Sequence, residues 1–101
     1  MDFKTTETAE ATEVRLTGRL EFTDHDRLGV IAAVVQGART QRFVIDMIDL
    51  EFIDSAGLGM LMILQEEAET RNIKMILRNL RGDVKRSIDL ARLGEIIAIE
   101  A

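Results

Sequence analysis

The sequence predicts an α/β fold with a largely parallel or mixed β-sheet. Apolar runs typical of strands alternate along the chain with helical patterns of about 10 to 15 residues, the order that β-α-β crossovers require. The 101 residues include no proline and seven scattered glycines, so no segment resembles a linker. With 47% hydrophobic and 31% charged residues, the chain is typical of one soluble globular domain, which we expect to span residues 1–101.

The first half of the chain carries two strand patterns and one helix pattern. A weak strand pattern covers residues 2–8, and a clearer one follows where Val14 and Leu16 alternate with polar residues. Thr23 and Asp24 offer side-chain oxygens that can accept hydrogen bonds from the free amides of a helix start. The helix itself is predicted from apolar residues at the spacing i, i+3, i+4, i+7, which are Leu28, Ile31, Ala32 and Val35.

The second half repeats this alternation. FVIDM (43–47) and KMILR (74–78) are short apolar runs typical of buried strands, with a helical pattern over residues 57–71 between them. Asp83 is predicted to cap a third helix that carries Val84, Ile88 and Ala91. A last strand is predicted over residues 96–99.

The composition excludes several classes of function. With no cysteine and one histidine, His25, the chain lacks the ligands of thiolate or histidine metal sites, and we expect no metal or cofactor. A net charge of −5 without tyrosine or tryptophan argues against nucleic-acid binding. No apolar run approaches the roughly 18 residues of a membrane span, and the start is too polar for a signal peptide. We therefore expect a cytoplasmic protein without direct membrane contact, whose partner is a protein or a small ligand.

The stretch FIDSAGLGML, residues 52–61, is the most informative part of the sequence. It places Ser55 after a predicted strand and ahead of the next helix, where functional residues of α/β sheets tend to lie. Ser55 or Asp54 could simply cap that helix by accepting a hydrogen bond from Gly57 or Leu58, worth about 1 kcal/mol. A nucleophilic serine is disfavoured, because the pattern G-x-S-x-G is absent and Asp54 is no base comparable with a histidine.

The helix that follows begins with two turns that are apolar nearly all round. At about 100° per residue, Met60 and Ile63 fall well away from the face that the helix turns to the sheet. That face consists of Leu58, Leu61, Leu64 and Ala68. An apolar collar beside Ser55 predicts a contact surface for a partner. Alternatively, another helix of the same domain covers Met60 and Ile63.

Two glycines, Gly57 and Gly59, stand in the first turn of this helix, where good helix formers would be about 1 kcal/mol better per position. Their missing side chains let another backbone approach, or let the helix start pack tightly on its strand. The fragment G-x-G is too short to indicate a dinucleotide site.

These residues resemble the signature of STAS domains, specifically the bacterial anti-sigma factor antagonists. The core of the resemblance is D-S-x-G-L-G at residues 54–59, preceded by the strand FVIDM and the acidic turn at 48–51. It extends through essentially the whole chain, including Leu16-Thr17-Gly18 and Val84-Lys85-Arg86. The resemblance implies a small mixed sheet with helices packed on one side.

It also implies a function in partner switching without enzymatic activity. In the family, the serine after the motif aspartate, here Ser55, is phosphorylated by a partner that is both anti-sigma factor and serine kinase, with a histidine-kinase-like ATPase domain. The unphosphorylated form binds this kinase, phosphorylation releases it, and a metal-dependent serine phosphatase resets the cycle. The resemblance and the apolar collar together predict a partner-binding surface made of Glu21, Thr23, Asp24, Asp54, Ser55, Ala56, Gly57, Leu58, Gly59, Met60 and Ile63.

Two departures from sporulation-type members bear on the partner. Ala56 stands where those members often have a second serine, and residues 18–24 read GRLEFTD where they tend to have G-E-L-D. The identity of the partner is therefore left open. A kinase or phosphatase domain of a biofilm, motility or stress pathway is an alternative to a kinase that holds a sigma factor. A further alternative is a permanent STAS subunit of an ABC-type membrane transport complex, in which Ser55 only caps the helix.

Overall fold

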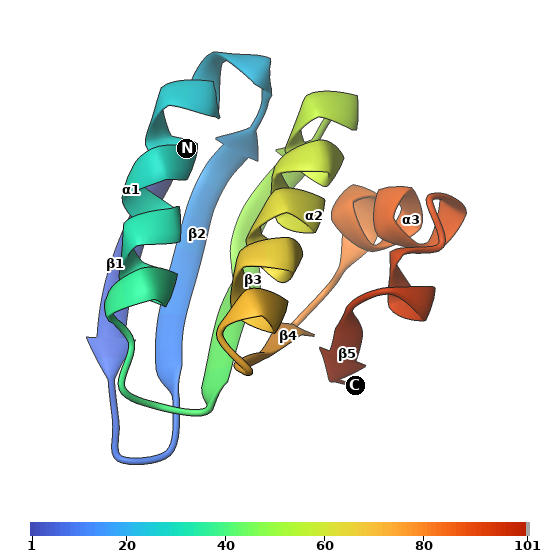
Figure 1. The fold of residues 1–101 in the computed structure, drawn as a ribbon. Helices are drawn as coiled ribbons and strands as arrows, with labels where there is room; N and C mark the ends of the chain where they lie inside the picture. The colour runs from blue at the N-terminus through green and yellow to red at the C-terminus, as the bar shows by residue number, and fades with distance from the viewer. Residues whose placement is uncertain (101) are drawn as a thin grey trace.

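The computed structural model describes residues 1–100, which form five strands, three α-helices and two 3₁₀ turns (Figure 1). In the first half these are β1 (Asp2–Glu7), β2 (Thr12–Leu20), the 3₁₀ turn η1 (Phe22–Asp24), α1 (His25–Gly37) and β3 (Arg42–Ile53). In the second half they are α2 (Ser55–Thr70), β4 (Lys74–Arg78), α3 (Gly82–Leu90), the 3₁₀ turn η2 (Leu93–Glu95) and β5 (Ala98–Glu100). The predicted order of strands and helices is confirmed.

The sheet is mixed, and its strands follow one another in chain order, β1-β2-β3-β4-β5. Only β1 is antiparallel to its neighbour, whereas β2 to β5 run parallel. Because parallel crossovers are right-handed and these all step in the same direction, they bring every helix to the same face of the sheet. Figure 1 shows α1 and α2 side by side across that face, with α3 beyond α2. The α/β class and the one-sided packing implied by the family resemblance are both confirmed.

The main core lies between this helical layer and the sheet. It includes the inward residues of the central strands, such as Leu16, Ile45 and Leu77, together with Ile31 of α1, Leu61 of α2 and Ile88 of α3. On the other face, which we call the open face, a second small cluster consists of Ala11, Val44 and Ile76, with Ala98 packed against them. Val44 and Ile76 are only 0% and 4% exposed although no helix of residues 1–100 covers that face (Figure 1).

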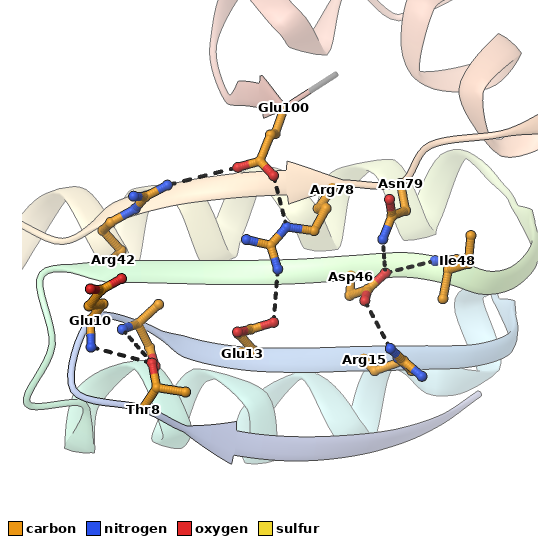
Figure 2. Close-up of polar contacts among 11 residues, drawn as sticks. Thr8, Glu10, Glu13, Arg15, Arg42, Asp46, Ile48, Arg78, Asn79 and Glu100 are labelled. Carbon is orange, nitrogen blue, oxygen red and sulfur yellow. Dashed lines mark hydrogen bonds and ion pairs between the residues drawn. The ribbon is translucent and has the colours of Figure 1, made fainter.

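Long charged side chains cover the open face instead (Figure 2). The Arg78 guanidinium donates from Nη1 to Glu13 Oε1 at 2.9 Å and from Nε to Glu100 Oε1 at 3.0 Å, and so links strands β2, β4 and β5. Asp46 on β3 accepts hydrogen bonds from Asn79 at 2.9 Å and from Arg15 at 3.3 Å. The stems of such side chains shield apolar atoms while their charged ends pair.

Strand β3 is much longer than the predicted strand 43–47 and contains two bulges. The pairing of β2 with β3 slips by one residue between Arg15 and Thr17, and again between Gly18 and Arg19. The inward residues of β3 therefore change from a spacing of two to a spacing of three, ending at Leu50 and Ile53. The acidic turn expected at residues 48–51 is wrong, because these residues continue β3. The bulges lie in this stretch and interrupt the apolar run from which the strand was predicted.

The predicted helix caps before α1 and α3 are wrong. Asp24 is the N-cap residue of α1 but forms no side-chain capping bond, because its carboxylate accepts from the Glu21 N–H at 2.9 Å and from the Met1 amino group at 3.0 Å. The turn η1 precedes α1 and already supplies backbone acceptors there. Asp83 lies inside α3, whose N-cap is Arg81 and has no side-chain capping bond. The last strand also begins later than predicted, at Ala98 instead of residue 96.

Candidate functional site

Ser55 is the first residue of α2, directly beyond the carboxyl end of β3, and its side chain is exposed. The capping role belongs to its neighbour, because Asp54 Oδ1 accepts the Gly57 N–H at 2.8 Å. Within residues 1–100, no side-chain hydrogen bond involves the Ser55 hydroxyl. Of the two residues considered as caps, Asp54 is therefore the cap, and Ser55 presents a free hydroxyl at the surface.

The second oxygen of Asp54 holds a distant segment in place. Asp54 Oδ2 accepts the Phe22 N–H at 3.1 Å, and the Asp54 N–H donates to the Leu20 carbonyl at 3.2 Å. These bonds join the end of β2 and the turn η1 to the start of α2. Two segments separated by 32 residues in sequence thus meet beside Ser55.

The two glycines of α2 differ in their surroundings. A Cβ on Gly57 would lie 2.6 Å from the Leu20 carbonyl oxygen and 2.7 Å from Ile53 Cγ1, so this residue is a glycine because the helix start packs tightly on the ends of β2 and β3. A Cβ on Gly59 would meet no atom within 4 Å. Only Gly57 therefore requires the small side chain, and its burial removes it from any partner surface.

The predicted apolar collar is wrong at Met60, which is buried, whereas Ile63 is exposed and its role as a contact stays a prediction. Met60 is 4% exposed and, with Leu28, Ile31 and Leu64, lines a small cavity between α1, α2 and the sheet. Ile63 is 48% exposed, and its neighbour Met62 is 43% exposed. The prediction counted only the sheet as cover for α2, whereas α1 lies alongside and buries the flank that carries Met60. The alternative that another helix covers both residues holds for Met60 alone.

The other predicted partner-binding residues are spread around Ser55 with unequal access. Ala56, Leu58 and Gly59 are half-buried at the start of α2, and Thr23 is exposed on η1. Glu21 is half-buried and forms an ion pair with Arg19 at 2.8 Å. Asp24, however, is 8% exposed and fully engaged with internal donors, so it is a structural residue and not a contact for a partner.

Electrostatics explains why Asp24 stays charged although it is buried. Burial alone would raise the pKa of Asp24, but hydrogen bonds from the Glu21 N–H and the Met1 amino group, with the charge of Arg27 nearby, outweigh it and hold the pKa below its ordinary value. The carboxylate thus fastens η1 from the inner side.

Two exposed apolar residues next to this site were missing from the sequence-based list. Phe22 on η1 is 70% exposed, and Leu90 at the end of α3 is 78% exposed. Leu90, Ala91 and Ser87 line one side of a shallow groove, and the other side carries Ser55 with Phe52, Ile53, Asp54 and Leu58. Leu90 could have been found from spacing, because it lies two residues beyond Ile88 and so off the buried face of α3. Nothing in the sequence around Phe22 indicated exposure.

An arginine lies against the same edge. The Arg19 guanidinium sits 4.1 Å from the centre of the Phe52 ring, a cation–π geometry, and pairs with Glu21. Within residues 1–100, no group of three His, Cys, Asp or Glu side chains is placed to hold a metal ion. In the same part of the chain, no helix is long and apolar enough to span a membrane. The arrangement is an exposed hydroxyl on the rim of an apolar groove.

Comparison with known proteins assigns the family. The family model described as "Mlab, STAS domain" matches residues 3–98. This chain belongs to the STAS domain family. A STAS-domain containing protein of Pseudomonas aeruginosa (strain UCBPP-PA14) is 24% identical over 86 residues, which cover 85% of this chain and 84% of that protein.

Solved structures show the same fold at low identity. The anti-sigma factor antagonist SpoIIAA in its unphosphorylated form superposes with a TM-score of 0.80 and 22% identity, covering 99% of this STAS domain and 89% of that chain. A Bacillus SpoIIAA in its phosphorylated form gives a TM-score of 0.72 and 20% identity, covering 99% and 92%. A sulfate transporter family protein from Wolinella succinogenes also gives 0.72 and 20%, covering 93% and 80%. These likenesses show the STAS fold.

Proposed function

We propose that this STAS domain is a partner-switching regulator of the anti-sigma factor antagonist type, in which phosphorylation of Ser55 releases a bound serine kinase. The observation that carries the proposal is the free, exposed hydroxyl of Ser55 on the rim of the groove between α2 and α3. The existence of SpoIIAA in unphosphorylated and phosphorylated forms, on the same fold, supports it.

In the forward step, the Ser55 hydroxyl oxygen attacks the γ-phosphorus of a nucleoside triphosphate bound to the kinase. The bond from that phosphorus to the β,γ-bridging oxygen breaks, the diphosphate leaves with the electron pair, and the hydroxyl proton passes to a base of the kinase. Asp54 is not that base, because both of its oxygens already accept backbone N–H groups. In the reverse step, a metal-dependent phosphatase adds water and releases inorganic phosphate.

Release follows from charge. The phosphate adds about −1.5 to −2 charges beside Asp54, at the rim of an apolar contact. The helix N-terminus offsets only about 0.3 to 1 kcal/mol. A like charge at 4 Å costs on the order of 4 kcal/mol at an effective dielectric of 20, and each 1.4 kcal/mol is about tenfold in affinity. Dissociation of the partner is therefore favoured over the local gain at the helix.

A constitutive subunit of an ABC-type membrane transport complex is the second candidate. The family description "Mlab, STAS domain" and the likeness to a sulfate transporter family protein favour it. Its premise that Ser55 is only a cap is weakened, because Asp54 provides the cap. In this alternative the groove beside Ser55 contacts a transporter ATPase permanently, and residue 55 does not control binding.

The test is capture from the native lysate with wild type, Ser55→Ala and Ser55→Asp as baits. We expect Ser55→Ala to retain a protein with a histidine-kinase-like ATPase domain and Ser55→Asp to lose it by at least about tenfold. The matched control is Thr6→Asp, which adds the same charge next to the open-face residues Lys4 and Arg15 and should keep the partner. If all four baits retain the same transporter ATPase equally, the switch is rejected and the transport role replaces it.

A further inference from the structure

Among residues 1–100, the carboxylate of Asp54 is the one side chain whose hydrogen bonds join the start of α2 to the turn η1. Its Oδ1 accepts Gly57 N–H at 2.8 Å, and its Oδ2 accepts Phe22 N–H at 3.1 Å. The next residue in the chain is the phosphate acceptor, Ser55. Phe22 in turn carries one of the most exposed apolar side chains of the described residues, at 70%. The proposed modification site and this apolar ring are thus connected through one ionised group.

The two hydrogen bonds of Asp54 differ in how they can respond to a neighbouring charge. Gly57 belongs to the same helical turn as Asp54, and the Leu58 N–H to Asp54 carbonyl bond at 3.0 Å keeps that turn closed. Phe22 belongs to another segment, and its N–H reaches α2 only through the carboxylate. When a dianion is added at residue 55, the two anionic groups repel each other and compete for the same few N–H donors at the helix start. The hydrogen bond from the Phe22 N–H is therefore the one that we expect to weaken.

We infer that Asp54 is a positioning residue that couples Ser55 phosphorylation to the turn η1: the phosphate weakens the Asp54–Phe22 bond, and Phe22 leaves the position in which it contacts the partner. This rests on the proposed phosphorylation of Ser55 and adds a mechanism to it. Phosphorylation then acts twice, by placing charge at the rim of the contact and by loosening an apolar anchor next to it. Aromatic residues held in a fixed position contribute most to such contacts, so the loss of fixation weakens binding.

The turn η1 is built so that it can respond in this way. Its inner side is fastened by Asp24, which accepts the Glu21 N–H at 2.9 Å, so residue 21 stays in place. Its outer side, where Phe22 lies, depends on Asp54 from the other segment. Asp24 and the Asp54 N–H to Leu20 bond would hold the end of β2 even when the Phe22 bond opens. We therefore expect a local change at Phe22 and no unfolding of the domain.

The test measures amide hydrogen exchange by NMR on the isolated protein, with serine or phosphoserine at position 55. We expect the Phe22 amide to exchange at least about tenfold faster in the phosphoserine form, while the Gly57 amide stays protected. Asp54→Asn supplies the second arm, because asparagine is an equally good cap but has only one acceptor oxygen. In that variant the Phe22 amide should exchange fast from the start, and phosphoserine should add nothing. Thr6→Asp is the charge control and should leave Phe22 unchanged.

The coupling and the proposed function can fail separately. Unchanged Phe22 exchange in the phosphoserine form overturns the coupling, even if the partner is released. Slower exchange also overturns it, since it would mean that the phosphate itself accepts the Phe22 N–H. Faster exchange at Phe22 with full retention of the captured kinase would leave the coupling in place and reject the release mechanism.

Discussion

The open face of the sheet and the edge around Ser55 are both uncovered surfaces, but they differ in how their apolar and polar side chains are arranged. On the open face, the apolar side chains of Val44 and Ile76 are hidden, and the charged ends of Arg78, Glu13 and Glu100 bind one another. At the Ser55 edge, Phe22 and Leu90 are exposed and the serine hydroxyl has no partner within the described residues. The open face thus satisfies its own charges and hides its apolar groups, whereas the Ser55 edge leaves both kinds of group exposed.

This difference supports the docking site proposed for the partner. A face whose ion pairs are already formed gains little from a second protein, because those pairs would have to be broken or desolvated. An edge with exposed aromatic and leucine side chains gains free energy when they are covered, at about 25 cal/mol per Å² of apolar surface. Although no helix of residues 1–100 covers the open face, that face is therefore not the expected interface, and the groove between α2 and α3 is the proposed one.

The largest expected effect tests how tightly the Ser55 edge is built. Gly57→Ala should destabilise the domain by about 3 kcal/mol, because the new methyl group would overlap the Leu20 carbonyl oxygen and Ile53. Gly59→Ala is the matched control, and it should stabilise by up to about 1 kcal/mol since its methyl group enters open space. Urea unfolding at neutral pH measures both. Equal effects of the two substitutions would contradict the tight contact at residue 57.

A second substitution pair compares the two surfaces directly. Phe22→Ala should change the free energy of unfolding by less than about 0.5 kcal/mol yet weaken partner binding about tenfold, because the ring contributes to the contact and not to the core. Arg78→Met should do the reverse, costing about 1 kcal/mol of stability by removing two ion pairs while leaving binding unchanged. Calorimetric titration with the captured partner separates the outcomes. Weaker binding by Arg78→Met would place the interface on the open face.

The smallest expected effect is a pH dependence that arises on the open face. Burial alone would raise the pKa of Asp46, but hydrogen bonds from Asn79 and the Ile48 N–H and the charge of Arg15 outweigh it and hold the pKa below its ordinary value. Because the unfolded chain then takes up the proton first, the stabilisation is present above about pH 4 and is lost as the pH falls through the lower folded value.

Asp46→Asn tests this assignment, since an amide cannot titrate. The variant should be less stable than wild type at pH 7, and the gap should narrow as the pH falls from about 5 to 3. Urea unfolding at several pH values gives the comparison. A gap that is constant with pH would show that Asp46 is not the group responsible. Asp24 changes stability in the same direction and is present in both proteins, so it cancels.

The sequence predicted the parts of the fold that repeat a regular period. The strand at residues 74–78 was placed within its observed bounds, and the helix after Ser55 began two residues earlier than expected. The strand follows from its continuous apolar run, and the helix follows from apolar residues at helical spacing. The family signature at residues 52–61 likewise led to the STAS fold, because this motif forms one local turn from strand to helix.

The remaining features depend on contacts between segments distant in sequence. For Met60, contact with a partner and cover by another helix were both open, because no local pattern reveals that α1 lies beside α2. Asp24 seemed to be a cap because aspartate ahead of a helix usually is one, whereas here its oxygens bind Glu21 and Met1. The Phe22 N–H donates to Asp54, a residue 32 positions away. Periodicity carries no signal for such pairings.

The bulges of β3 also determine where a residue can be deleted without moving the other side chains of the strand to the opposite face. Each bulge places one additional residue opposite β2, and by exposure these are Ile48 and Glu51. Ile48 is tied, because its N–H binds Asp46 and its carbonyl accepts from Arg81. Glu51 has no such side-chain contact among residues 1–100. Deletion of Glu51 would leave every other residue of β3 on its present face of the sheet and Ser55 at the start of α2. A one-residue deletion within residues 43–46 would instead move the side chains on one side of the deletion to the opposite face of the sheet.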